Sequence, residues 1–137
     1  MHPIELRFPS DPSVLETLQQ IVEAVGRSAE VMEDEVSSLS IAVIELVKNA
    51  MEHGNGYDPE KFVTMSIGMF PNRIRFMIDD EGSWEPEKAL GFYPGEGDEL
   101  LSTRGRGVLI ARNLAKWVEF GLNPEGNTRV TLIWPLN

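Results

Sequence analysis

The sequence predicts an α+β sandwich in which helices cover one face of a mixed, mostly antiparallel sheet. Three observations lead to this class. Alternating apolar and polar residues mark strands, apolar residues at helical spacing mark helices, and the two kinds of segment do not alternate strictly along the chain. The expected order is a strand, two helices, two strands, a long loop, a helix and two strands. Such layers leave room for a site between the helices and the loop.

The N-terminal part predicts one strand and one helix. In residues 4–8, IELRF, apolar side chains alternate with charged ones, as in a strand with one buried face. A helix is expected to begin here, because Pro12 is favoured in a first helical turn and Asp11, directly before it, is a favoured helix cap. Apolar residues then recur at helical spacing, and Gly26 is expected to end the helix.

A second helix is expected from about Glu33 to Met51. Its apolar residues form a single stripe: Val36, Leu39, Val43, Val47 and Ala50. The run HGNGYDP at residues 53–59 is rich in glycine and ends in proline, and is therefore expected to break this helix.

The C-terminal half predicts the rest of the sheet. Residues 62–70 and 73–79 both alternate and are separated by two residues, which indicates an antiparallel hairpin. Residues 82–104 are loop-like, and a loop of this length in a compact domain is usually functional or mobile. A helix is expected after Gly107, followed by strands near 117–121 and in 127–136.

Composition limits the possible functions. A length of 137 residues suggests one domain, 1–137, and the absence of cysteine excludes disulfides, thiolate metal sites and a cysteine nucleophile. The formal net charge of −10 argues against nucleic acid as the main partner, since phosphate backbones require a basic surface. The sequence shows no signal peptide and no transmembrane run, so a cytoplasmic location without membrane contact is expected.

Glu45 and Asn49 lie four residues apart on the second helix and therefore point the same way. An asparagine oxygen suits magnesium, and a glutamate can orient a metal-bound water or take a proton from a hydroxyl. An exposed glutamate and a helix-end asparagine would explain the pair equally well.

Asp80 stands where the second hairpin strand ends, two residues before Gly82. A carboxylate at this place can accept the exocyclic amino group of a base, while the glycine lets a flat ring approach. A turn-forming aspartate is the alternative interpretation.

The segment STRGRGVLIARNLA at residues 102–115 could bind phosphate. Gly105 and Gly107 precede an apolar helix, and helix N-termini present free N–H groups and a positive dipole end. Arg104 and Arg106 add positive charge in an otherwise acidic chain. A helix-capping turn is the alternative.

Thr128 opens the last strand after Gly126, where its hydroxyl could lie near a bound base; a simple hairpin turn is the alternative. His53 has no second ligand at metal-binding spacing, so it is expected to pack or to cap the helix end. No G-x-S-x-G pattern supports a serine nucleophile.

These motifs, taken in order, resemble the ATP-binding domain shared by gyrase, heat-shock chaperones, sensor histidine kinases and the mismatch-repair ATPase, the GHKL superfamily. The order is E-x-x-x-N in a helix, D-x-G after a hairpin, a long loop, G-x-G before a helix and G-x-T before the final strand. The resemblance covers nearly the whole chain and implies a Bergerat-type ATP-binding fold.

Within that superfamily the chain is similar to the anti-sigma-factor serine/threonine kinases of bacteria. ELVKNAMEHGN is similar to their asparagine box, and DEGSWEP to their variant of the first glycine box. The broad superfamily has glycine where Trp84 stands, and leucine is more usual than Val108. Neither the phosphoacceptor helix of a sensor kinase nor the second domain of a gyrase-like ATPase is expected here.

The resemblance implies a role for each motif residue. Glu45 matches the general base and Asn49 the magnesium ligand. Asp80 matches the aspartate that receives the adenine amino group, with Gly82 beside it, and Thr128 matches a threonine near adenine.

The phosphate side of the site follows from the same resemblance. Gly105 and Gly107 match hinge glycines near the phosphates of ATP, and Arg104 and Arg106 flank them. The implied cofactors are therefore ATP and Mg2+.

The implied reaction is transfer of the γ-phosphoryl group to a serine or threonine of an anti-anti-sigma factor with a STAS domain. A sigma factor is the implied rival partner, and a homodimer the implied assembly. Two other functions stay open: a nucleotide-binding module that sequesters a partner without phosphorylating it, and an orphan sensor-kinase catalytic domain acting on histidine.

Overall fold

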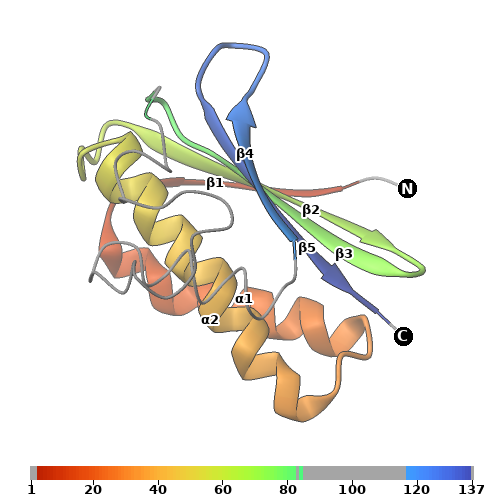
Figure 1. Ribbon diagram of the computed structural model, residues 1–137. Coiled ribbons are helices and arrows are strands. Elements are labelled where there is room, and N and C mark those ends of the chain that lie inside the picture. The colour runs from red at the N-terminus through yellow and green to blue at the C-terminus, as the bar shows by residue number, and fades with distance from the viewer. Residues whose placement is uncertain (1–2, 83, 85–116, 137) are drawn as a thin grey trace, which may run out of the picture.

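The computed structural model describes residues 3–82, 84 and 117–136, which form a five-stranded sheet with two long helices on one face (Figure 1). The predicted α+β two-layer class is confirmed. The elements in chain order are β1 (Ile4–Pro9), η1 (Pro12–Val14), α1 (Leu15–Ser28), α2 (Glu33–Asn49), η2 (Ala50–Gly54), β2 (Phe62–Phe70), β3 (Arg73–Asp79), β4 (Trp117–Leu122) and β5 (Thr128–Pro135).

The sheet has the strand order β1-β2-β3-β5-β4, and every pairing among the described strands is antiparallel. The predicted hairpin is confirmed, with Phe70 opposite Arg73 at its closed end. Because β3 and β5 are antiparallel neighbours, with Asp79 opposite Arg129, the end of β3 and the start of β5 meet at one edge of the sheet. That edge holds the candidate site.

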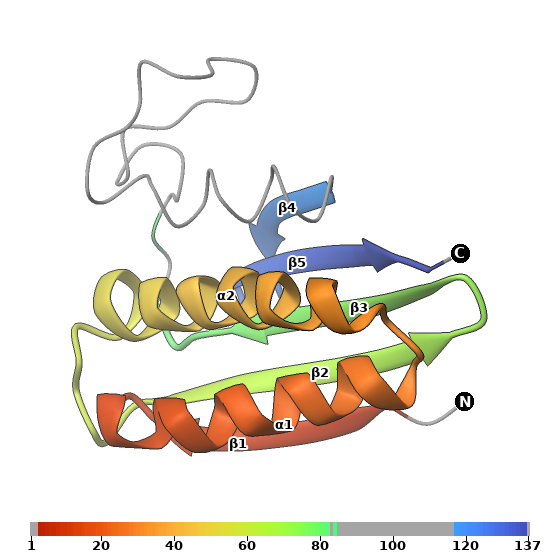
Figure 2. The same ribbon diagram turned by 90° about the horizontal axis from the view of Figure 1, so that it is seen from below.

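The core lies between the sheet and the helices, and Figure 2 shows both helices on the same side of the strands. The stripe predicted for the second helix is buried throughout, as Val36, Leu39, Val43, Val47 and Ala50 are each at most 2% exposed. Alternate sheet residues complete it, since Met65, Ile78 and Val130 form one buried row across three strands. The helical and strand periodicities therefore point at the same core.

The prediction that Gly26 ends the first helix is wrong, because α1 continues to Ser28. Gly26 is buried where the two helices approach, and an added Cβ would lie 3.0 Å from Cδ2 of Leu39. The chain instead reverses at Glu30, which has a φ of 61°. Gly26 is thus a packing glycine and not a helix stop.

The other helix boundaries are close to expectation. Asp11 caps the first turn as predicted, because its side chain accepts a hydrogen bond from the backbone N–H of Ser13 at 2.9 Å. The regular part of α2 ends at Asn49, and the π-helical turn η2 then carries the chain to Gly54. Among the described residues, no helix is long and apolar enough to cross a membrane.

Candidate functional site

The candidate site lies where η2 meets the end of β3 and the start of β5. The backbone N–H of Asp80 donates to the carbonyl of Thr128 at 3.2 Å, and the N–H of Thr128 donates to the carbonyl of Gly82 at 2.9 Å. The D-x-G and G-x-T motifs are separated by about a third of the chain, yet they share these main-chain hydrogen bonds. The structure therefore brings three of the predicted site residues together.

Two glycines shape the turn around the Asp80 carboxylate. Oδ1 of Asp80 accepts the backbone N–H of Gly82 at 2.8 Å. A Cβ on Gly82 would overlap the carbonyl oxygen of Gly54, and a Cβ on Gly54 would overlap Oδ2 of Asp80. Only glycine fits at either place. Sequence reasoning treated Gly54 as part of a helix breaker, and nothing in the local pattern reveals its contact with Asp80.

Asp80 is an unusual carboxylate. Only 4% of the residue is exposed. Burial raises the pKa of Asp80 to about 6, against the lowering effect of hydrogen bonds from Trp84 and Gly82. At neutral pH the carboxylate is charged and is surrounded by neutral N–H donors. It is therefore suited to recognise an N–H group of a ligand.

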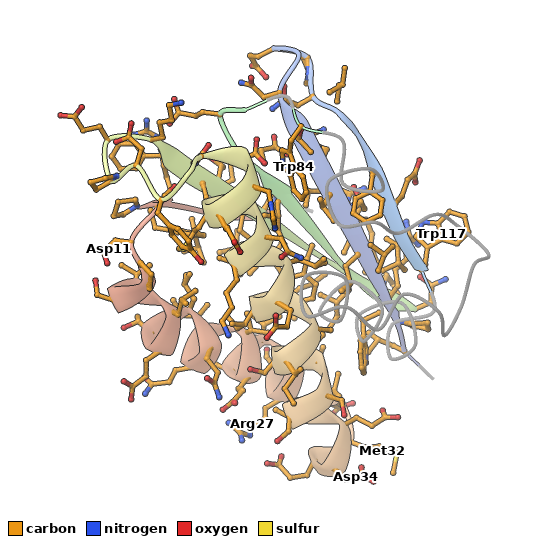
Figure 3. The ribbon with its side chains drawn as sticks, turned by 60° about the vertical axis from the view of Figure 1, so that its left-hand side comes forward. Asp11, Arg27, Met32, Asp34, Trp84 and Trp117 are labelled. Atoms are coloured by element: carbon orange, nitrogen blue, oxygen red, sulfur yellow. The ribbon has the colours of Figure 1, made fainter. Side chains whose placement is uncertain are left out.

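Trp84 covers the second oxygen of Asp80. Its indole Nε1–H donates to Oδ2 at 2.6 Å, and its ring stacks on His53 with 5.2 Å between ring centroids. Its backbone N–H donates to Oγ1 of Thr128 at 3.0 Å, and that hydroxyl donates back to the Trp84 carbonyl at 2.9 Å. Figure 3 shows Trp84 near the C-terminal end of α2 and Trp117 apart from it on β4. His53 packs, as the sequence indicated.

Asn55 is a further residue that sequence reasoning missed. It is 3% exposed, and its Nδ2 donates to Oγ of Ser10 at 2.8 Å and to the carbonyl of Phe62 at 3.0 Å. Its Oδ1 accepts the backbone N–H of Glu81 at 2.8 Å. One side chain thus joins η2, the start of β2 and the turn that carries Asp80. Its position in the glycine-rich run suggested a loop, not a buried anchor.

Glu45 and Asn49 lie on consecutive turns of α2, and His53 follows four residues later in η2. Asn49 is 9% exposed, and its Nδ2 has no hydrogen-bond partner among the described residues. The side chain of Glu45 is 33% exposed and accepts a hydrogen bond from Lys48 at 3.4 Å. Glu45, Asn49 and His53 therefore follow one another along the helix, from the half-exposed carboxylate of Glu45 to the His53 ring that stacks on Trp84 beside Asp80.

Two groups of residues in the site have the chemistry to bind parts of a magnesium nucleotide, one for the base and one for the metal ion. Asp80 and the two glycines offer a base an acceptor in a close-fitting turn. Asn49 offers a buried amide whose unsatisfied atom is the donor Nδ2, which suits a phosphate oxygen, while its amide oxygen is of the kind that magnesium accepts as a ligand. No group of three or more histidine, aspartate or glutamate residues that could hold a metal occurs in the described ranges. Asn49 would hold the ion together with phosphate oxygens and water.

The predicted phosphate side falls outside the described residues. It comprises Arg104, Gly105, Arg106, Gly107 and the helix expected after them. Their roles stay predictions.

Comparison with known proteins gives a consistent result. Residues 8–134 match the histidine kinase-like ATPase domain family. The serine-protein kinase RsbW of Bacillus subtilis (strain 168) is 28% identical over 116 residues, which cover 81% of this chain and 72% of that protein. RsbW of Bacillus velezensis is 25% identical over 134 residues, covering 94% and 81%. RsbW of Oceanobacillus iheyensis is 28% identical over 120 residues, covering 81% and 73%.

Proposed function

The chain belongs to the histidine kinase-like ATPase domain family, and on that premise we propose that it is an ATP-dependent serine/threonine protein kinase. The relatives that it matches over most of its length are named serine-protein kinases. Its motifs resemble those of anti-sigma-factor kinases. The proposed target is a serine or threonine of an anti-anti-sigma factor with a STAS domain, and the proposed rival partner is a sigma factor.

The observation that carries this proposal is the environment of Asp80. A nearly buried carboxylate, held between two glycines, accepts an N–H from the edge of a flat bicyclic ring. The amino group and ring of adenine present the same combination of donor and plane. This match supports binding of ATP at the end of β3 better than it supports a structural role for the aspartate.

Each residue then has a distinct task. Asp80 orients the base, with Gly82 and Thr128 supporting it, and Asn49 holds magnesium. When bound, ATP with Mg2+ supplies the γ-phosphoryl group, which leaves the oxygen of ADP and bonds to the oxygen of the partner's hydroxyl. Glu45 takes the proton of that hydroxyl. Its half-exposed position on α2 is accessible to a protein substrate.

The remaining parts of the proposal rest on the resemblance and on composition. We propose that residues 1–137 act as one domain, in the cytoplasm, as a homodimer. The net charge of −10 supports a protein partner over nucleic acid. Arg104, Gly105, Arg106 and Gly107 are assigned to the phosphates of ATP.

The test is phosphoryl transfer with a variant of the proposed general base. Glu45→Ala should abolish transfer from radiolabelled ATP to the partner recovered from the source cell, while ATP affinity changes by less than about 3-fold. Glu35→Ala, at an exposed position of the same helix, is the control and should leave both unchanged. Normal phosphorylation by Glu45→Ala would contradict the role of Glu45.

The same assay separates the other two functions. A wild-type protein that binds ATP without transferring phosphate would be a sequestering module. A phosphorylated product that is lost in acid would be phosphohistidine and would indicate a sensor-kinase catalytic domain. Phosphoserine or phosphothreonine survives the acid treatment, which is the expected result.

A further inference from the structure

We propose that Trp84 is an intramolecular competitor of the nucleotide base. Its indole ring occupies the recognition position on Asp80, and a nucleotide binds only after displacing it. This inference rests on the proposed function and deepens it, because it assigns a residue that sets both the affinity and the base selectivity of the site.

The geometry of the indole is that of a bound ligand. The Nε1–H reaches Oδ2 of Asp80 at 2.6 Å, which is short for a hydrogen bond to a charged acceptor. The ring plane stacks on His53 with 5.2 Å between centroids and 25° between planes. Indole and purine are both flat, bicyclic rings that present an N–H at one edge. Trp84 thus supplies the two features that a base would use here.

The carboxylate cannot accept a base while Trp84 stays in place. Asp80 is only 4% exposed, so an incoming donor reaches it only if a neighbour moves. Gly82 holds Oδ1 through its main chain, and Gly54 lies directly against Oδ2. Gly54 and Gly82 are each next in the chain to a residue of one hydrogen-bonded network. The side chain of Asn55 accepts the backbone N–H of Glu81 and donates to Ser10 and to the carbonyl of Phe62. Of the two described groups that donate to the Asp80 carboxylate, the main-chain N–H of Gly82 and the indole N–H of Trp84, only the indole belongs to a rotatable side chain.

Displacement makes the site selective. Once the indole leaves, the buried carboxylate loses a donor, and a ligand must replace that donor or leave the charge unsatisfied. Adenine replaces it with its amino group. Hypoxanthine presents a carbonyl oxygen at the same place, which repels the carboxylate. The competitor therefore reduces the apparent affinity for every nucleotide to the fraction of its intrinsic value given by the time that the site is open. Only a ligand that places an N–H donor where adenine has its amino group replaces the lost hydrogen bond.

The decisive variant is Trp84→Phe, which keeps an aromatic ring beside His53 but removes the N–H. It should bind ATP roughly 10-fold more tightly than wild type in calorimetry, because the competing hydrogen bond is lost. Trp117→Phe is the matched control, since Trp117 is 57% exposed on β4, and it should bind ATP like wild type. Thermal unfolding of both variants confirms that they fold.

Fluorescence gives a second measurement that needs no change at Trp84. In Trp117→Phe the remaining tryptophans are Trp84 and the buried Trp134. ATP should increase quenching of this protein by acrylamide, because the displaced indole enters solvent. ITP at the same concentration should leave the quenching unchanged.

The outcomes separate this inference from the proposed function. Equal or weaker ATP binding by Trp84→Phe, or protection of Trp84 from acrylamide by ATP, would overturn the competitor and leave an ATP site in which Trp84 contacts the bound base. Absence of ATP binding in wild type and both variants would overturn the proposed function and the competitor together.

Discussion

Asp79 and Asp80 are neighbours in the sequence and opposites in the structure. Asp79 lies on the sheet face away from the helices. There its carboxylate accepts two hydrogen bonds from Arg129, at 2.8 and 2.9 Å, and a third from Asn123 at 3.2 Å. Asp80 is held by Trp84 and Gly82, neither of which is charged. One carboxylate is neutralised by a cation and the other is left charged among neutral donors.

The difference shows that environment, not residue type, decides what a carboxylate can do. Asp79 and Arg129 are directly opposite in the β3–β5 register, so their ion pair forms between two neighbouring strands. Asp80 follows the last paired residue and turns toward the helix end, where burial raises its pKa to about 6. Asp79 therefore joins strands, while Asp80 keeps the capacity to recognise a ligand.

The largest effect is expected from a substitution that fills the space beside the Asp80 carboxylate and so removes the environment that distinguishes Asp80 from Asp79. Gly54→Ala places a methyl group where Oδ2 of Asp80 now lies, so either the carboxylate or the η2 backbone must shift. We expect a loss of unfolding free energy of about 3 kcal/mol, at the upper end for overpacking, together with loss of ATP binding. Urea unfolding and calorimetry measure the two effects.

Gly121→Ala is the control for that experiment. Gly121 lies in β4, and an added Cβ there meets nothing within 4 Å. This variant should keep wild-type ATP affinity. Unimpaired ATP binding by Gly54→Ala would mean that the Gly54–Asp80 contact is not required.

The pH dependence of the unfolding free energy tests whether the pKa of Asp80 is raised by burial. Its pKa is raised from 3.8 to about 6, so the folded protein binds more protons than the unfolded chain between these values. The unfolding free energy contributed by Asp80 should fall as pH rises from about 4 to about 6, by a total of about 2–3 kcal/mol. The wild-type minus Asp80→Asn difference, from urea unfolding at each pH, isolates this term. A flat difference would refute the raised pKa.

Removing the charge at each aspartate tests their separate roles. Asp80→Asn should weaken ATP binding by about 10- to 100-fold, because a charged acceptor of the base is lost. Its unfolding free energy at pH 7 should change little or rise, since burial of a charge is relieved. Calorimetry and urea unfolding again provide both values, and unchanged ATP affinity would argue against base recognition by Asp80.

The smallest effect is expected at the neighbouring position. Asp79→Asn weakens a half-buried ion pair with Arg129, so the unfolding free energy should fall by about 1 kcal/mol. ATP affinity should stay within about 2-fold of wild type, because Asp79 faces away from the site. A larger loss of affinity than in Asp80→Asn would reverse the assignment of the two carboxylates.

The sequence predicted correctly those features that depend on a single helix or strand. The stripe on α2 and the alternation in β2, β3 and β5 were predicted correctly because helical and strand periodicities are local properties. The prediction failed at Gly26, whose role depends on how closely α1 and α2 approach. Asp80, Gly82 and Thr128 were singled out as motif residues, and the resemblance placed them near the same base, but only the structure shows that they share main-chain hydrogen bonds.

The sequence by itself therefore determined the layers, the core face of each element and the motifs that identify the family. Only the tertiary structure placed Gly54 and Asn55 against the turn of Asp80, paired Asp79 with Arg129, and laid the Trp84 indole on the Asp80 carboxylate. The physical reason is that the contacts of Asn55 with Glu81 and of Asp79 with Arg129 join segments 26 and 50 residues apart, and that the Trp84 ring is positioned by His53 and Thr128, which lie on other elements. Their geometry follows from the packing of a helix end on a sheet edge, which no local pattern encodes.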